Sequence, residues 1–312
     1  MTSVPPPSEP SGSLHTHPEV PAGVVPAPRP PAPSGPDGHP GERGTGLLGA
    51  VPAWAPLAAM ISAFVLATIA YLLIAAGIEA GGGNVTTGGP PGLVISATLV
   101  QDLALIAAAL GFASLWSRGL TPGDFGFRRV ALGPAAGWTL LTFVAFWILT
   151  GIYISLVGEP DQQELTRDLR EEEALTALIG YGVLLAFVAP LAEEIFFRGF
   201  VFGVLREKIG IAWGAIATGV VFGLVHVAGS PIETVGVLII LGVLLCLLYQ
   251  RTGSLLPCIA LHAINNSISF AATKSLPWAA AVAIVLASTG AAVAVAGAVT
   301  RRRDLPGVRA RS

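Results

Sequence analysis

Residues 184–203 read LLAFVAPLAEEIFFRGFVFG, an apolar run interrupted by three charged residues, Glu193, Glu194 and Arg198. About 20 apolar residues are enough for a helix to cross a bilayer. A charged side chain near the bilayer centre costs about 2.5 to 3.5 kcal/mol even on the lenient insertion scale. Three charges so close together therefore predict a membrane helix whose polar side chains have partners or a chemical role.

The spacing of the charges predicts how they are used. Glu194 and Arg198 are four residues apart, so they share one face of a helix at the distance at which ion pairs form. Glu193 points about 140° away from Arg198, at about 100° per residue, and is left to face another helix. Pro190 cannot donate a hydrogen bond to the carbonyl of Ala186, so we expect a kink where the helix borders a polar cavity.

The rest of the chain has the same apolar character. Hydrophobic residues make up 53% of it and charged residues 12%, against about 25% charged in soluble proteins. We therefore expect an all-α fold, a polytopic membrane helix bundle of about eight transmembrane helices with an intramembrane polar cavity. The expected spans are 55–78, 91–116, 133–157, 174–203, 211–227, 232–250, 255–272 and 277–299. A net charge of -2 indicates no nucleic-acid partner.

The distribution of basic residues predicts the orientation in the cell membrane. With both termini in the cytoplasm, thirteen basic residues lie inside and three outside, and Arg198 within a span completes the total of 17. Short cytoplasmic loops carry such an excess. The outer residues are Arg167, Arg170 and Lys274. Arginine far outnumbers lysine and alanine and glycine are plentiful, which suggests a bacterial source.

Three regions differ in composition. Residues 1–46 are rich in proline and glycine and hold too little apolar bulk for a core, so we expect a disordered cytoplasmic tail. Residues 47–300 form the predicted transmembrane domain, and 301–312 a basic cytoplasmic tail.

Two further spans carry polar residues in helical spacing. Phe222 precedes His226 by four residues in one span, and His262 precedes Asn266 by four in another. From the cytoplasmic ends of their helices, Glu193, His226, His262 and Asn266 lie about 15, 22, 10 and 17 Å deep at about 1.5 Å per residue. One pocket at middle depth can hold all four. For a single membrane histidine, packing against a neighbouring helix is as good an explanation.

These four residue types have complementary chemistry. A buried carboxylate beside a neutral imidazole can take a proton from water and later deliver it to a leaving amine. An imidazole and an amide one turn apart can both donate to an oxyanion. No serine or cysteine stands in a comparable setting, which favours attack by water over an acyl-enzyme.

With these motifs the sequence resembles the CPBP family of intramembrane proteases, also called the CAAX prenyl protease type 2, Abi or bacteriocin-processing family. The resemblance covers about residues 120–272, and each of its three motifs lies on a separate span. The motif residues, in order, are Glu193, Glu194 and Arg198, then Phe222 and His226, then His262 and Asn266.

The resemblance implies an intramembrane endopeptidase in which Glu193 and His226 activate the attacking water. It implies that His262 and Asn266 stabilise the oxyanion and that the predicted ion pair supports the site. The implied substrate is a membrane-embedded or lipid-anchored peptide, such as a bacteriocin-like precursor or a membrane-anchored regulator.

The sequence is compatible with two hypotheses about a cofactor, hydrolysis without a metal and hydrolysis with zinc. Family names include metalloprotease, but the chain lacks the His-Glu-x-x-His helix that usually presents zinc. Glu193, His226 and His262 can still supply three ligands, the minimum for a catalytic zinc site. We favour a glutamate-dependent hydrolase without a cofactor and keep zinc as the alternative.

Two other functions compete with proteolysis. Intramembrane acids and histidines also form relays in ion-coupled transporters, but no inverted repeat of the kind many transporters have is evident. The other is a non-catalytic immunity or scaffold protein that binds a peptide without cutting it. Asp102, in the second span, is more readily explained by pairing with a polar group in the bundle than by a catalytic role.

Overall fold

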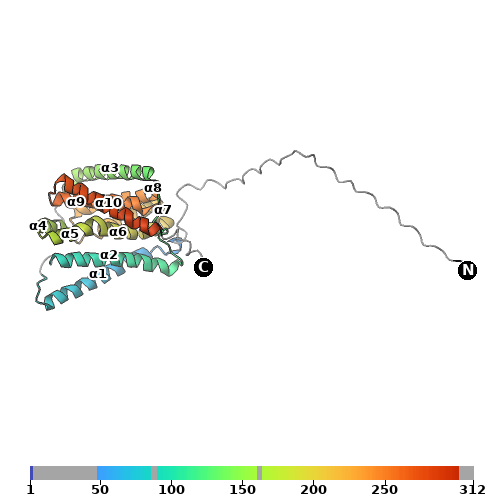
Figure 1. Cartoon of the computed structure of the whole chain (residues 1–312), viewed down its shortest axis with the longest axis horizontal. Coiled ribbons are helices and arrows are strands. Elements are labelled where there is room, and N and C mark those ends of the chain that lie inside the picture. Colours follow the sequence, from blue (N-terminus) through green and yellow to red (C-terminus); the bar gives the residue numbers. More distant parts are fainter. Residues whose placement is uncertain (3–47, 86–89, 160–163, 302–312) are drawn as a thin grey trace. The chain divides into compact units, whose positions relative to one another are not determined.

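The computed structural model describes residues 1–2, 48–85, 90–159 and 164–301, and its described helices belong to the compact unit His39–Ser312. Within these ranges all regular secondary structure is helical (Figure 1). The prediction of an all-α polytopic membrane bundle is therefore confirmed. Of the predicted tail 1–46, the structure describes only residues 1–2. Of the predicted basic tail 301–312, it describes only residue 301.

Six helical elements are long and apolar enough to span a membrane in the described part of the chain. One of them, Leu175–Leu224, is 50 residues long and contains Gly210 with a φ of 81° and a ψ of 168°, which are not helical values. This break separates the predicted fourth span from the fifth. The helix Trp278–Arg301 is a further candidate, although its apolar part Trp278–Ala291 is shorter than a full span. With Leu175–Leu224 counted as two and this helix added, the described helices correspond to the eight predicted spans.

The bounds of the elements follow the apolar runs closely. They are η1 Leu48–Ala50, α1 Ala55–Ala80, α2 Pro91–Trp116, α3 Leu132–Val157, α4 Glu164–Glu171, α5 Leu175–Val183, η2 Leu184–Val188, α6 Ala189–Glu193, η3 Glu194–Phe202, α7 Gly203–Leu224, α8 Ile232–Thr252, α9 Leu255–Thr273 and α10 Trp278–Arg301. The short α4, between α3 and α5, was not predicted, since the acidic stretch around it has little apolar content.

Burial separates peripheral helices from a central one. In the most apolar 18-residue stretch of each helix, only 17% is buried in α1 and in α3, whereas 56% is buried in α9. The outward side chains of α1 and α3 are large and apolar, as expected for a surface in contact with lipid tails. Helix α9, which carries two of the candidate residues, therefore lies in the interior of the bundle.

The fourth span is not a regular α-helix. Segments η2 and η3 are π-helical and flank the short α6, which has Pro190 in its first turn. We predicted a kink at Pro190, and what the structure shows is a π-helical segment on each side of the short helix that contains it. Such turns are rare and occur frequently at functional sites. Segment η3 is also the most buried part of the span, with every residue from Glu194 to Phe202 shielded.

Three glycines bring α7 and α8 into backbone contact. A Cβ atom on Gly219 would lie 2.8 Å from the backbone nitrogen of Val243, and one on Gly242 would lie 2.8 Å from the Cα of Gly219. Gly219 and Gly223 are four residues apart, the small-xxx-small pattern that permits close helix packing in membranes. This contact fixes the end of α7, beyond which His226 lies.

Candidate active site

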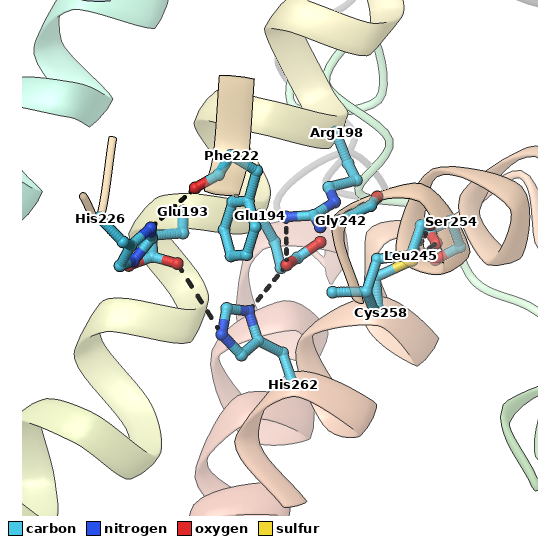
Figure 2. Close-up of polar contacts among 10 residues, drawn as sticks. All are labelled: Glu193, Glu194, Arg198, Phe222, His226, Gly242, Leu245, Ser254, Cys258 and His262. Atoms are coloured by element: carbon cyan, nitrogen blue, oxygen red, sulfur yellow. Dashed lines mark hydrogen bonds and ion pairs between the residues drawn. The ribbon is translucent and has the colours of Figure 1, made fainter. Parts of the chain in front are cut away.

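The predicted ion pair between Glu194 and Arg198 is present in η3. Arg198 Nη1 donates to Glu194 Oε1 over 2.8 Å, and both side chains are 0% exposed. Arg198 Nη2 also donates to the carbonyl of Gly242 in α8 over 3.3 Å. The guanidinium carbon lies 4.6 Å from the centre of the Phe222 ring, within the range of a cation–π contact. The buried cation is thus surrounded by a charge, a carbonyl and an aromatic face (Figure 2).

His262, on α9, lies between the two glutamates. Its Nδ1 is 2.8 Å from Glu194 Oε1, and its Nε2 is 3.8 Å from Glu193 Oε2. When Glu194 is ionised, its carboxylate only accepts, so the hydrogen of this bond belongs to Nδ1 of His262. Figure 2 shows Arg198, Glu194, His262 and Glu193 connected in one series of contacts.

The two glutamates differ in exposure. The side chain of Glu194 is 0% exposed and that of Glu193 is 16% exposed. Glu194 is therefore enclosed by its partners, whereas Glu193 keeps a surface that a water molecule or a peptide can reach. This difference agrees with the prediction that Glu193 faces away from the ion pair.

His226 lies in the turn that follows α7, because the helix ends at Leu224. Its Nδ1 is 2.7 Å from the carbonyl oxygen of Phe222. A carbonyl oxygen can only accept, so Nδ1 carries a hydrogen and, in the neutral ring, Nε2 is left as an acceptor. The Phe222 ring packs against both imidazoles, with ring centres 5.2 Å from His226 and 5.9 Å from His262.

Asn266 lies one turn beyond His262 on α9. Its Nδ2 donates to the carbonyl of Leu185 in the π-helical segment η2 over 3.0 Å. This bond uses one of the two N–H groups of the amide. Asn266 also lines a cavity of about 290 Å³, whose wall does not include Glu193, His226 or His262.

The four predicted catalytic residues do not all contact one another. Glu193 and His262 face each other, and Asn266 follows His262 on the same helix. No hydrogen bond or ion pair joins Glu193 to His226 within the described ranges. The same ranges contain no group of three His, Cys, Asp or Glu side chains placed to hold a metal ion. The zinc alternative with Glu193, His226 and His262 as ligands stays a prediction.

Asp102 is a feature of the site that the sequence left unexplained. The residue is 1% exposed on α2, which packs against α6 and η3, the segments that carry Glu193 and Glu194. Its Oδ2 has no hydrogen-bond partner among the described residues. The expected pairing with a polar group is not observed for this oxygen.

Two contacts were not foreseen from the sequence. The carbonyl of Gly242 belongs to a residue without a functional side chain, so no pattern of side chains could identify it. Phe222 belongs to a motif, but its packing against Arg198 and both imidazoles depends on how three helices meet.

Fold and site together define a polytopic helical membrane protein with a buried acid–histidine–arginine cluster. Residues 175–268 match a family model described as Rce1-like, type II CAAX prenyl endopeptidase Rce1-like. The matched segment contains every motif residue and agrees with the resemblance to the CPBP family. Because this is a protease family, the match supports a CAAX-type intramembrane protease. Comparison with curated proteins and with solved structures gives no match.

Proposed function

We propose that the protein is an intramembrane endopeptidase that hydrolyses a peptide bond of a membrane-associated peptide with an activated water. The observation that carries this proposal is the position of His262 between the buried Glu194 and the partly exposed Glu193. A fully buried carboxylate holds the imidazole in place, while the second carboxylate is 16% exposed and so can be reached by water. The family match of residues 175–268 points to the same chemistry.

In the proposed first step, Glu193 and His226 hold the attacking water. Glu193 accepts a proton from the water, and the acceptor Nε2 of neutral His226 orients it. As the water oxygen bonds to the carbonyl carbon, the carbonyl electrons move onto oxygen. Glu193 and His226 make no direct hydrogen bond among the described contacts. A single water can bridge two such groups.

In the proposed second step, the oxyanion is stabilised and the amine leaves. The free N–H of Asn266 donates to the oxyanion, and so does Nε2 of His262 when that ring carries both protons. Collapse of the intermediate breaks the carbon–nitrogen bond. Glu193 then returns the proton to the leaving amine, which gives a new carboxyl end and a new amino end.

The ion pair has a positioning role in this proposal. Arg198 neutralises Glu194, and Glu194 in turn accepts the Nδ1 hydrogen of His262. Partners of this kind fix the orientation and tautomer of a histidine. Arg198 therefore acts through Glu194 and His262 and does not contact the substrate.

The proposed substrate is a membrane-embedded or lipid-anchored peptide, and the proposed location is a cell membrane with both protein termini in the cytoplasm. The large apolar surfaces of α1 and α3 support contact with lipid. A bacteriocin-like precursor or a membrane-anchored regulator has the required apolar segment.

The proposal is tested with purified protein in phosphatidylcholine liposomes and a set of quenched-fluorescent peptides that each contain a 20-residue apolar segment. We expect the wild type to cut at least one peptide. Glu193→Gln and His226→Ala should each abolish cleavage, and the double variant should be hardly worse than either single variant, because both act on one proton transfer. Peptide binding and thermal stability serve as controls for folding.

Three outcomes would count against this mechanism. Cleavage by Glu193→Gln at the wild-type rate would remove Glu193 as the base. Multiplied losses in the double variant would show that Glu193 and His226 act independently. Tight binding of the peptides by wild-type protein without any cleavage would favour the scaffold function.

A further inference from the structure

A second, larger hollow lies between α3, α9 and α10 and has a volume of about 750 Å³. The first half of α3 forms one wall, the first half of α9 forms the other, and Thr289 of α10 completes the lining. Leu132 and Leu140, in the α3 wall, are 84% and 64% exposed. The hollow is therefore a groove that opens on the lipid-facing side of the bundle.

The groove lies behind the helix that carries His262 and Asn266. At about 100° per residue, each lining residue of α9 points about 100° or more away from His262. Neither His262 nor any of the other three candidate catalytic residues lines the groove. An occupant therefore contacts the back of α9 and cannot present a peptide bond to the candidate site. The lining residues of α9 are Leu256, Pro257, Ala260, Leu261 and Ile264.

One end of the groove carries a positive charge. Ser254 Oγ, at the start of α9, donates to the carbonyl of Arg128 over 2.7 Å. The backbone N–H of Leu255 donates to the carbonyl of Gly126 over 2.9 Å. These bonds fix the segment before α3 to the start of α9, and the next residue, the exposed Arg129, lines the groove there. Among the described residues that line the groove, Arg129 is the one that carries a charge.

The length of the groove corresponds to one leaflet of a bilayer. Its lining on α3 extends from Leu132 to Phe143, a separation of about 16 Å at 1.5 Å per residue. The hydrocarbon core of a bilayer is about 30 Å thick, so one leaflet contributes about 15 Å. Arg129 lies at the end that the excess of basic residues assigns to the cytoplasm. The groove therefore extends from the predicted cytoplasmic surface to the middle of the membrane.

These features define the chemistry of the occupant. Apolar walls offer water no hydrogen-bond partners, so a hydrocarbon chain is the group that fills such a groove in a bilayer. At the charged end, a guanidinium can form paired hydrogen bonds with a phosphate. It has five N–H donors, so it can do this in addition to contacts within the protein. Anionic phospholipids of the cytoplasmic leaflet carry both the chain and the phosphate.

We propose that the groove binds an acyl chain of an anionic phospholipid from the cytoplasmic leaflet, with the lipid phosphate at Arg129. The bound lipid packs against the face of α9 opposite His262 and Asn266 and so stabilises the helix that carries them. The lipid anchor of a substrate would bring its peptide to this same opposite face, and it carries no phosphate for Arg129. The inference goes beyond the proposed proteolysis and does not depend on it, because binding is measured directly.

The test is a lipid titration of the purified full-length protein after its lipids have been removed in detergent. The probes are phosphatidylglycerol and phosphatidylcholine with the same palmitoyl and oleoyl chains, and native mass spectrometry counts the bound molecules. We expect phosphatidylglycerol to bind more tightly and to raise the melting temperature by roughly 5 °C at saturation. Arg129→Gln should lower the affinity for phosphatidylglycerol about fivefold and leave that for phosphatidylcholine unchanged.

Two further changes separate the groove from general attraction to the surface. Arg118 is exposed and belongs to the same connection between α2 and α3, but it does not line the groove. Arg118→Gln removes the same charge and should leave both affinities unchanged. Ala260→Phe places a ring in the groove and should prevent binding of both lipids. If that variant does not fold, Ala136→Phe fills the groove from the α3 wall.

Four outcomes would overturn the inference. The first is equal affinity of the wild type for the two lipids, and the second is an equal loss in Arg129→Gln and Arg118→Gln. The third is unchanged binding of phosphatidylglycerol by folded groove-filling variants, which would place the lipid elsewhere. The fourth is another occupant. Tighter binding of an uncharged palmitoylated peptide would assign the groove to a substrate anchor, and a lipid-free dimer that the groove-filling variants dissociate would assign it to a second copy of the chain.

Discussion

Arg198 illustrates how a charge is accommodated inside this bundle. Its side chain is 0% exposed and depends on Glu194, four residues earlier, for neutralisation. Removing one member of a buried pair leaves an uncompensated charge, which typically costs about 3 to 5 kcal/mol. Replacing both members removes the charge altogether, so the double change should be less harmful than the sum of the two.

We therefore expect Arg198→Ala to lower the yield of folded protein and its melting temperature in detergent. Adding Glu194→Gln should restore part of both, because the amide oxygen can still accept from His262 while the stranded charge is gone. The coupling is measured from the melting temperatures and size-exclusion profiles of the two single variants and the double variant. Strictly additive losses would show that the ion pair in the structure contributes no coupling.

The metal requirement gives a second prediction at the scale of side chains. Glu193 and His262 face each other, but no third His, Cys, Asp or Glu of the described residues completes a metal-binding group. A catalytic zinc needs about three protein ligands. We expect protein treated with a strong chelator and shown by elemental analysis to be free of zinc to keep its full rate. Loss of activity that returns on addition of zinc would contradict this.

The sequence predicted one contact of the candidate site, the ion pair, and did not predict the others. The spacing of Glu194 and Arg198 was sufficient to predict the ion pair, because a helical face fixes both positions locally. The contact of Glu194 with His262 spans 68 residues of sequence and depends on how η3 meets α9. Depth along the helices predicted that the two could meet but could not show which glutamate His262 would contact more closely.

At the scale of elements, the contact between α7 and α8 positions His226. A Cβ on Gly223 would lie 2.8 Å from the carbonyl oxygen of Val235, a backbone atom that cannot move aside by a rotamer change. We expect Gly223→Ala to separate the two helices, to lower the melting temperature and to reduce the cleavage rate by displacing His226.

Gly137 offers the matched control for this change. It lies in α3, and a Cβ there would meet nothing within 4 Å. Gly137→Ala should be neutral or should stabilise the helix by up to about 1 kcal/mol, since alanine has the higher helix propensity. Equal effects of the two substitutions would mean that the close approach of α7 and α8 does not matter.

The elements themselves were predicted well because apolar runs of membrane length allow few alternatives. The helix bounds agree to within a few residues in most spans. The π-helical segments η2 and η3 escaped prediction, since an angle of about 100° per residue was assumed throughout. Pro190 indicated that the helix would be irregular there, but a missing N–H does not specify which irregular form the chain takes.

At the scale of the whole molecule, two lysines outside the spans donate to backbone carbonyls at two ends of the helices. At one end, Lys208 Nζ donates to the carbonyl of Gly49, near the start of α1. At the other end, Lys274 Nζ donates to the carbonyls of Arg170 and Glu172, after α9 and near α4. The end near Gly49 belongs to the side for which the sequence predicts the excess of arginine.

This arrangement gives a direct prediction for the orientation in the membrane. Eight spans place both termini on the same side, and the excess of Lys and Arg assigns that side to the cytoplasm. A reporter fused after Ser312 should therefore be cytoplasmic, and the same reporter inserted within residues 158–172 should lie on the opposite side. Proteins fused at either position must retain peptide cleavage, so that only correctly folded molecules are scored. If both reporters lie on one side, the number of spans between the insertion and Ser312 is even, and the predicted five spans there are wrong.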